Sequence, residues 1–214
     1  MGIHHLVSFS GGFDSTCAVF LQLQEGSMPV HIHHINLINR ERRDIAERLA
    51  IVDILDWLRD SYTFTYSESV CDVRQDSKRF MSYDYRYYLP ILCGVALNMP
   101  CKRVVLNLGI VGSSGPAYKP GGIPYEFIKN CYFLYRKEHL IKLTPDIMCP
   151  TLVGSKKKLL TLIPPELARL THSCRMPYFK NTKWLNCGKC RTCKEMKLTR
   201  GSFRNTDFVT AFLE

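Results

Sequence analysis

The 214-residue sequence lacks the features that would place it in a membrane or a secretory pathway. No apolar run reaches the roughly 18 to 20 residues that cross a bilayer. The first five residues lack the charged and then apolar pattern of a signal peptide, and they lead almost directly into an apolar run. Internal repeats and low-complexity segments are also absent. We therefore expect a cytoplasmic protein with one sizeable core and no membrane partner.

A disulfide framework is not expected either, although ten cysteines are many for a chain of this length. Thiols of cytosolic proteins stay reduced. Four of the cysteines gather near the C-terminus and need a separate explanation. The other six are scattered, and we interpret most of them as small core residues: Cys17, Cys71, Cys93, Cys101, Cys131 and Cys149.

Acidic residues are few relative to basic ones, and the formal net charge is +10. This bias suits a polyanionic partner such as ATP, a nucleotide product or nucleic acid. However, the basic residues are spread out, and only 40–43 and 156–158 are dense. Solvated basic faces explain the charge equally well, so binding to nucleic acid is an open alternative.

An anion-binding loop is predicted near the N-terminus. The apolar run 6–9 is typical of a short buried strand, and residues 15–23 carry the apolar stripe of a helix. The turn between them is small and contains two glycines, which let the backbone approach phosphate oxygens at the start of a helix. It contains no lysine, so it is not the GxxxxGK[ST] phosphate loop. An ordinary Gly-Gly turn is the other interpretation.

Apolar periodicity predicts that strands and helices alternate about five times. This alternation indicates a doubly wound parallel α/β sheet of about five strands in residues 1–170, followed by a smaller C-terminal segment, 171–214. Pro90 conflicts with a regular helix and should kink it or lie in its first turn. The irregular stretch 109–124 follows a strand end, where such sheets bind ligands. The later strands are predicted at 30–38, 62–67, 103–108 and 139–143, the later helices at 40–60, 83–98 and 125–134, and a loop at 68–78.

Four cysteines near the C-terminus have the spacing of a metal site. Cys187, Cys190 and Cys193 form a CxxCxxC run, and Cys174 lies a dozen residues upstream. Four thiolates at about 2.3 Å suit tetrahedral zinc and leave no open position, so the role would be structural. Gly188 would let the loop fold tightly, with its amides facing the sulfurs. An iron–sulfur cluster and reduced, unliganded thiols are the alternatives. Downstream, a short helix is expected near 206–212.

Two segments resemble the signatures of known families. Residues 10–16, Ser-Gly-Gly-Phe-Asp-Ser-Thr, resemble the SGGxDS signature of the PP-loop ATPases, which have an adenine nucleotide alpha hydrolase-like fold. Residues 171–174, Thr-His-Ser-Cys, followed by Cys-Gly-Lys-Cys-Arg-Thr-Cys at 187–193, resemble the TxSC…CGxCxxC signature of the QueC family. That family is the 7-cyano-7-deazaguanine synthases.

The resemblance implies an ATP-dependent ligase that forms carbon–nitrogen bonds. The family converts 7-carboxy-7-deazaguanine to the nitrile with ammonia and two ATP, through an acyl adenylate and the amide. ATP, Mg²⁺ and a structural Zn²⁺ are therefore the implied cofactors. Relatives are often homodimers, so a homodimer is an expectation for this chain.

The implied site residues lie at both ends of the chain. Asp14 would position magnesium or the loop. Lys156 belongs to a Pro150…Ser155-Lys156 segment similar to the family's P…(S/T)K, and Arg86 falls at the place of a family Arg-Asn pair. Both would stabilise charge or contact substrate, unless Lys156 is a surface lysine and Arg86 an ordinary ion-pair partner. The ATP-binding residues would be Ser8, Phe9, Ser10, Gly11, Gly12, Asp14, Ser15 and Thr16, and the zinc ligands Cys174, Cys187, Cys190 and Cys193.

The chain departs from the family pattern where relatives face the base. The family carries an acidic, cysteine-containing GYPDC-type segment, but the nearest stretch here, 122–127, has neither that aspartate nor that cysteine. Arg86 is followed by Tyr87 and not by asparagine, and Lys158 stands where relatives often have glutamate. The acceptor is therefore less firmly implied than the ATP chemistry.

Other roles stay open because of this departure and, for tRNA thiolation, because of the basic charge. The same ATP chemistry could serve deazapurine conjugation, DNA modification or defence, or tRNA thiolation. Thiolation needs a catalytic cysteine, for which Cys71, Cys93 and Cys149 are candidates. A pure binding role would require an inert ATP site.

Overall fold

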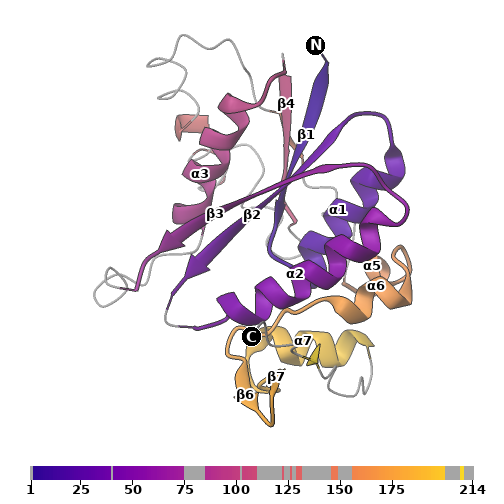
Figure 1. Ribbon diagram of the computed structural model, residues 1–214, viewed down its shortest axis with the longest axis vertical. Helices are drawn as coiled ribbons and strands as arrows, with labels where there is room; N and C mark the ends of the chain where they lie inside the picture. The colour runs from indigo at the N-terminus through magenta and orange to yellow at the C-terminus, as the bar shows by residue number, and fades with distance from the viewer. Residues whose placement is uncertain are drawn as a thin grey trace.

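The computed structural model describes residues 2–39, 41–74, 85–101, 103–109, 122, 126, 129–131, 146–148, 156–200 and 208–209. Parallel strands form one five-stranded sheet in the order β3-β2-β1-β4-β5 (Figure 1). The strands are β1 (Ile3–Phe9), β2 (Val30–Ile38), β3 (Thr65–Asp72), β4 (Arg103–Asn107) and β5 (Asp146–Met148). The strand order reverses direction between β1 and β4, which is where open α/β sheets place their ligands.

Helices cover both faces of this sheet. α1 (Phe13–Glu25) and α2 (Asp44–Arg59) share one core cluster, and α3 (Tyr85–Asn98) packs in a second cluster. Because side chains alternate along a strand, Val7 enters the α1–α2 core while its neighbour Leu6 enters the α3 core. The predicted α/β class with a parallel sheet is therefore confirmed.

Most predicted elements that the structure describes are confirmed. β2 has the predicted bounds, and α3 covers Tyr85–Asn98 of the helix expected at 83–98, whose first two positions lie outside the described residues. Pro90 lies in the interior of α3 and not in its first turn. The strand expected at 139–143 lies outside the described residues, and the fifth strand that the structure describes is β5. Most of the helix expected at 125–134 lies outside them as well.

The third strand is the main correction. It was expected at 62–67, but β3 begins at Thr65 and continues through residues expected to be a loop. The apolar residues that suggested the earlier start, Tyr62 and Phe64, pack against the α1–α2 core ahead of the strand. β3 lies at the edge of the sheet, and each of its residues is exposed or half-buried, so it has no buried apolar face for periodicity to detect.

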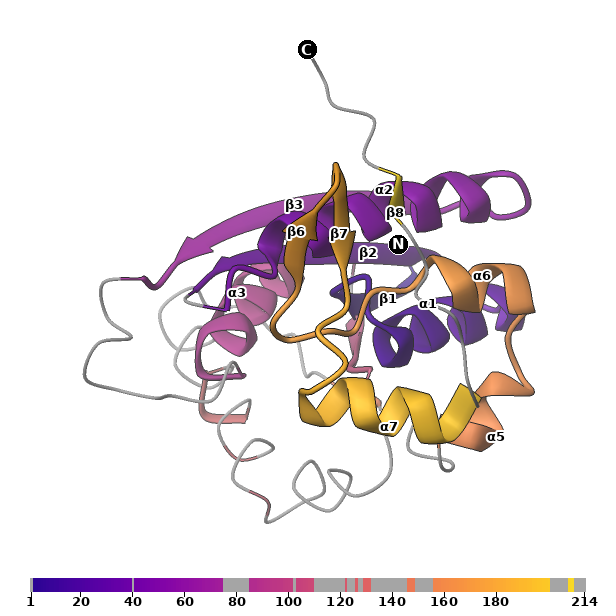
Figure 2. The same ribbon diagram turned by 90° about the horizontal axis from the view of Figure 1, so that it is seen from below.

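The chain returns to the main core before it reaches the cysteines. Leu159, Ile163 and Leu167 belong to the α1–α2 core cluster, so the connection ahead of the C-terminal segment is firmly packed. Figure 2 shows β6 and β7 as a hairpin beside α2, with α7 at the opposite end of the segment. These later elements are α5 (Lys156–Leu160), α6 (Pro165–Leu170), β6 (Tyr178–Lys180), β7 (Lys183–Leu185), α7 (Arg191–Arg200) and β8 (Phe208–Val209).

β6, β7 and β8 form a second, antiparallel sheet in that order. The helix expected near 206–212 is wrong at Phe208–Val209, because these two residues extend this sheet by pairing with β7. Among the described helices, none has both the length and the apolar character to span a bilayer.

Candidate functional site

Residues 10–12, here called the glycine loop, connect the central strand β1 to α1. The Ser10 amide donates to Ser15 Oγ at 3.2 Å, and the two serine hydroxyls lie 3.0 Å apart. The hydroxyls of Ser15 and Thr16 donate to the Gly12 carbonyl at 3.1 Å and 2.8 Å. These bonds fold the loop around the first turn of α1, whose amides and dipole favour an anion.

Close packing requires glycine at two positions around this loop. Gly11 has φ +67°, and a Cβ there would lie 2.9 Å from Ile51 Cγ1 and 3.1 Å from the Glu47 carbonyl oxygen. Gly109 follows β4, and a Cβ there would lie 2.5 Å from Ser15 Cα. The loop is thus pressed between α2 and the end of β4, which fixes its position at the strand-order reversal.

The C-terminal segment also holds the glycine loop. The His172 amide donates to the Gly11 carbonyl at 2.9 Å, and the Phe13 amide donates to Ser173 Oγ at 2.9 Å. Ser173 therefore satisfies one of the amides that the start of a helix leaves without an intrahelical acceptor. It lies next to Cys174, so the cysteine segment and the loop are directly connected.

A cleft of about 540 Å³ opens beside the glycine loop. Of the eight sequence-predicted ATP-binding residues, four line it and four do not. The lining residues are Ser10, Gly12, Asp14 and Ser15. Phe9 and Thr16 are buried instead, and Thr16 uses its hydroxyl to hold Gly12.

Lys156 lies at the same cleft and is not an ordinary surface lysine. Its side chain is 15% exposed, and its ammonium lies 3.3 Å from Asp14 Oδ2 and 3.2 Å from Glu195 Oε2. Burial raises the pKa of Glu195, but hydrogen bonds from Arg191 and Lys156 outweigh it and hold that pKa below its ordinary value. A cation is thus clamped between the start of α1 and α7.

Arg86 is not brought to this cleft. It is an exposed residue in the first turn of α3, and the cleft-lining residues do not include it. The arginines that do line the cleft come from other elements. Arg43 pairs with Glu41 and Glu47 at 3.3 Å and 3.2 Å, and Arg175 lies 3.6 Å from Glu41.

The four predicted metal ligands come together. The sulfurs of Cys174, Cys187, Cys190 and Cys193 all lie within 4.8 Å of one another. Cys187 and Cys193 are 4.0 Å apart, and a tetrahedron of thiolates at 2.3 Å from zinc has edges of about 3.8 Å. The residues therefore fit such an ion, and the cluster could hold a metal such as zinc.

Backbone amides donate hydrogen bonds to these sulfurs and favour the thiolate form that a metal binds. Gly188 has φ +68°, and this turn directs the amides of Lys189 and Cys190 to Cys187 Sγ at 3.4 Å and 3.3 Å. Burial alone would raise the pKa of Cys187, but these amides lower it to about 7. Burial raises the pKa of Cys174 to about 11. Metals bind thiolates, and Cys187 loses its proton more easily than Cys174 does.

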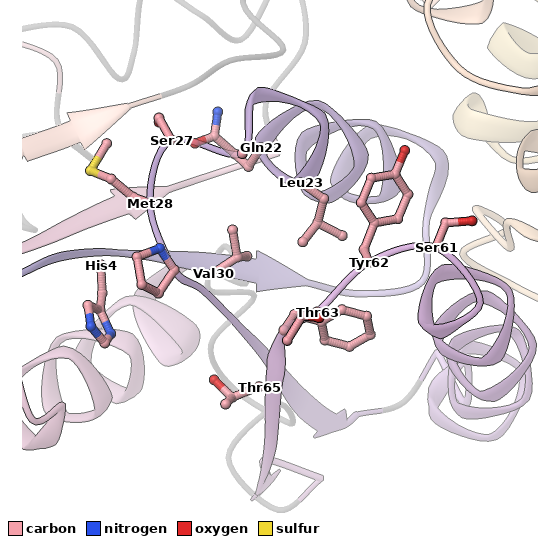
Figure 3. Close-up of a pocket in the computed structure, with 13 residues that line it drawn as sticks. His4, Gln22, Leu23, Ser27, Met28, Val30, Ser61, Tyr62, Thr63 and Thr65 are labelled. Carbon is pink, nitrogen blue, oxygen red and sulfur yellow. The ribbon is translucent and has the colours of Figure 1, made fainter.

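A second pocket lies at the other end of the strands, where α1 ends and β2 and β3 begin (Figure 3). Leu23, Met28, Val30 and Tyr62 contribute to a mainly apolar lining, and no lysine or arginine is among the described residues around it. It therefore lacks the charge that a nucleotide phosphate needs, which separates it from the cleft at the glycine loop.

Comparisons with known proteins do not assign a family. No family model and no curated protein matches the chain. Among solved structures, the chain is similar to a predicted subunit of a tRNA methyltransferase from Methanocaldococcus jannaschii. The TM-score is 0.41 at 18% sequence identity, over 76% of this chain and 74% of that chain. A likeness of this degree assigns no activity.

Sequence reasoning missed three functional contacts of this cleft. Ser173 lay inside the TxSC signature but had been given no role. Glu195 follows the last cysteine by two residues, and only the helical geometry of α7 brings its carboxylate to Lys156. Arg43 stood in a dense basic stretch, but its pairing with Glu47 depends on the start of α2. Only Ser173 had a sequence signal that could have identified it.

Proposed function

We propose that this protein is an ATP-dependent ligase that forms carbon–nitrogen bonds, on a PP-loop ATPase fold, by the reaction of a 7-cyano-7-deazaguanine synthase. The observation that carries the proposal is the convergence of the glycine loop, Lys156 and the cysteine segment on one cleft. This cleft lies where the strand order reverses, the usual ligand position in such sheets.

In this proposal the loop holds the phosphates of the ATP substrate. The amides of the first turn of α1 supply hydrogen bonds and a favourable dipole, and the Ser10 hydroxyl can turn from Ser15 to donate to a phosphate oxygen. A lysine ammonium has three donors, and two of those of Lys156 are directed to Asp14 and Glu195. The third can reach a phosphate oxygen, where positive charge stabilises the transition state.

Asp14 has two roles to reconcile. Its carboxylate holds Lys156, and it is also the oxygen ligand nearest the loop that Mg²⁺ would prefer. When bound, Mg²⁺ would neutralise phosphate charge. The chain's own contribution is to keep the carboxylate and the ammonium together, so that the lysine stays oriented toward the cleft.

The proposed reaction proceeds in two adenylations. The carboxylate oxygen of 7-carboxy-7-deazaguanine attacks the α-phosphorus of ATP, and pyrophosphate leaves. Ammonia then adds to the acyl carbon, loses a proton and displaces AMP, which gives the amide. A second ATP adenylates the amide oxygen, and loss of AMP with the remaining amide protons forms the nitrile. Zinc in the cysteine cluster would have a structural role, since four thiolates leave no open position.

A second candidate is the same ATP chemistry on another acceptor. The stretch 122–127 lacks the acidic, cysteine-containing segment that faces the base in the QueC family. A carboxylate other than the free base, carried by a protein or a nucleic acid, would account for this departure.

The test is product analysis with zinc-loaded protein. ATP, magnesium, ammonium and 7-carboxy-7-deazaguanine are mixed with the protein, and AMP and the base are followed by mass spectrometry. We expect AMP with the amide or the nitrile. Lys156→Met should lower AMP formation at least tenfold, whereas Lys157→Met, an exposed neighbour on α5, should not. AMP without those products would favour the second candidate, and no AMP with any carboxylate would refute both.

A further inference from the structure

The β6–β7 hairpin is a surface that the proposed ligase reaction does not use. It projects from the main body at the carboxyl end of β2 (Figure 1). Two of its aromatic side chains, Tyr178 and Phe179, are 45% and 49% exposed. Large aromatic residues of a monomer are usually more buried, so their exposure on a projecting element indicates a contact surface.

The hairpin has an aromatic face. Phe179 pairs with Trp184 across the two strands, and their ring centroids lie 5.6 Å apart. Trp184 also lines a pocket of about 650 Å³, together with Arg42 and Arg74. A pocket of this size accommodates a nucleotide-sized ligand. Aromatic rings stack on bases of any sequence, and arginines contact phosphate or stack on bases in turn.

The C-terminal segment that carries the hairpin is also positively charged. Lys180 and Lys183 stand directly opposite each other at its turn, and like charges in that position destabilise a hairpin. Residues 171–200 hold eight lysines and arginines but one acidic residue, so they carry seven of the chain's ten net positive charges. A zinc tetrathiolate would lower this local charge by two and leave it strongly positive.

Two aspartates balance the two arginines of the pocket. Asp44 lines the pocket, and Asp72 pairs with the Arg74 guanidinium, so the positive charge beside the pocket comes from the hairpin lysines Lys180 and Lys183. Arg42 has φ +52°, a conformation that costs energy for a residue other than glycine. This backbone places Arg42 at the pocket, while the adjacent Arg43 lines the ATP cleft.

We propose that the hairpin and its pocket bind single-stranded nucleic acid, with a base stacked on Trp184 and phosphates on Lys180, Lys183 and Arg42. The alternation of exposed rings and cations is the chemistry that recognises an unpaired strand. The pocket adjoins the ATP cleft through Arg42 and Arg43, so a bound strand would pass close to that cleft. The inference goes beyond the proposed ligase activity and does not depend on it.

The test measures nucleic-acid binding in the absence of ATP and of 7-carboxy-7-deazaguanine. Zinc-loaded full-length protein is titrated against a labelled single strand of about 12 nucleotides, the length that a small binding surface covers, at about 50 mM and 200 mM salt. Trp184→Ala should weaken binding roughly 5- to 150-fold, the range for loss of one stacked base. Lys180→Gln with Lys183→Gln should weaken it and reduce the slope of log affinity against log salt by about 1 to 2.

The matched control is Lys157→Gln with Lys158→Gln on α5, which removes the same charge far from the hairpin. A second readout keeps the test independent of folding. The chain has two tryptophans, so a Trp57→Phe background isolates the fluorescence of Trp184, which a stacked base should quench. Unchanged zinc content would show that each variant keeps the cysteine cluster.

Three results would overturn the proposal. Equal binding by the Lys180→Gln, Lys183→Gln variant and by the α5 control would show that affinity follows net charge alone. Equal quenching by mononucleotides and by the strand, at the same nucleotide concentration, would make the pocket a nucleotide site. Hairpin-dependent binding of an acidic peptide, with no quenching by the strand, would make the surface a protein-binding site. None of these results bears on AMP formation, which tests the ligase proposal separately.

Discussion

Substitution of Gly109 by alanine tests whether the end of β4 fixes the glycine loop. The new Cβ would lie 2.5 Å from Ser15 Cα and 2.8 Å from its amide nitrogen. Ordinary carbon contacts are about 3.5 to 4.0 Å, so the start of α1 would have to move by about 1 Å. Because both contacting atoms belong to backbone, no rotamer change can relieve the clash. Overpacking of this kind costs about 1–3 kcal/mol of unfolding free energy.

The functional loss should exceed the loss of stability. A shift of Ser15 would lengthen the hydrogen bond from the Ser10 amide to Ser15 Oγ, now 3.2 Å, and the one between the two hydroxyls, now 3.0 Å. It would therefore displace the hydroxyls that would meet phosphate. We expect ATP affinity to fall at least tenfold. Gly94→Ala is the matched control, because a Cβ there meets nothing within 4 Å in the interior of α3. It should raise stability by about 0.5–1 kcal/mol.

The two variants are compared by urea unfolding of zinc-loaded protein and by ATP titration. The expected difference between them in unfolding free energy is about 1.5–4 kcal/mol. If Gly109→Ala bound ATP like the Gly94→Ala control, with unchanged stability, the packing of β4 against α1 would not be what positions the loop.

Three further predictions concern the coupling of the two ends of the chain and its response to acid. Ser173→Ala removes the hydroxyl that accepts a hydrogen bond from the Phe13 amide, so unfolding free energy should fall by about 1 kcal/mol in urea titrations and ATP should bind more weakly. Ser69→Ala on the edge strand β3 should change neither. Removal of zinc by a chelator should release the cysteine segment. Hydrogen exchange of the His172 amide, which donates to the Gly11 carbonyl, should then become faster. An unchanged exchange rate of this amide would contradict the coupling. Burial lowers the pKa of His33 to about 4, with a further contribution from its histidine neighbours. As the pH falls, the unfolded chain takes up this proton first, so stability should fall by up to about 3 kcal/mol between pH 6.5 and 4. Urea titrations of His33→Gln across that range should lack this part of the pH dependence.

Local patterns were sufficient wherever an element has a strong apolar face or a fixed spacing. β2 alternates into two cores and has its predicted bounds, and the four cysteines meet as their spacing indicates. The strand, turn and helix around the glycine loop are likewise where periodicity places them. These features depend on neighbours in sequence, which is why a single chain reveals them.

Features that depend on distant packing were not predictable. β3 is an exposed edge strand with polar side chains, so its register follows from pairing with β2 and not from its own pattern. The clamp on Lys156 needs α7 to lie beside α5, and no spacing rule joins Glu195 to Asp14. The basic residues of 171–200 are separated from one another in the sequence, so a search for consecutive charges does not detect their excess over acidic residues.

The central claim is that this cleft cuts ATP between the α- and β-phosphates to activate a carboxylate. Exchange of labelled pyrophosphate into ATP measures that step directly, without ammonia and before any product forms. We predict exchange that requires 7-carboxy-7-deazaguanine and that falls at least tenfold in Lys156→Met but not in Lys157→Met. Release of ADP and phosphate with no exchange, or equal exchange by both variants, would contradict the account.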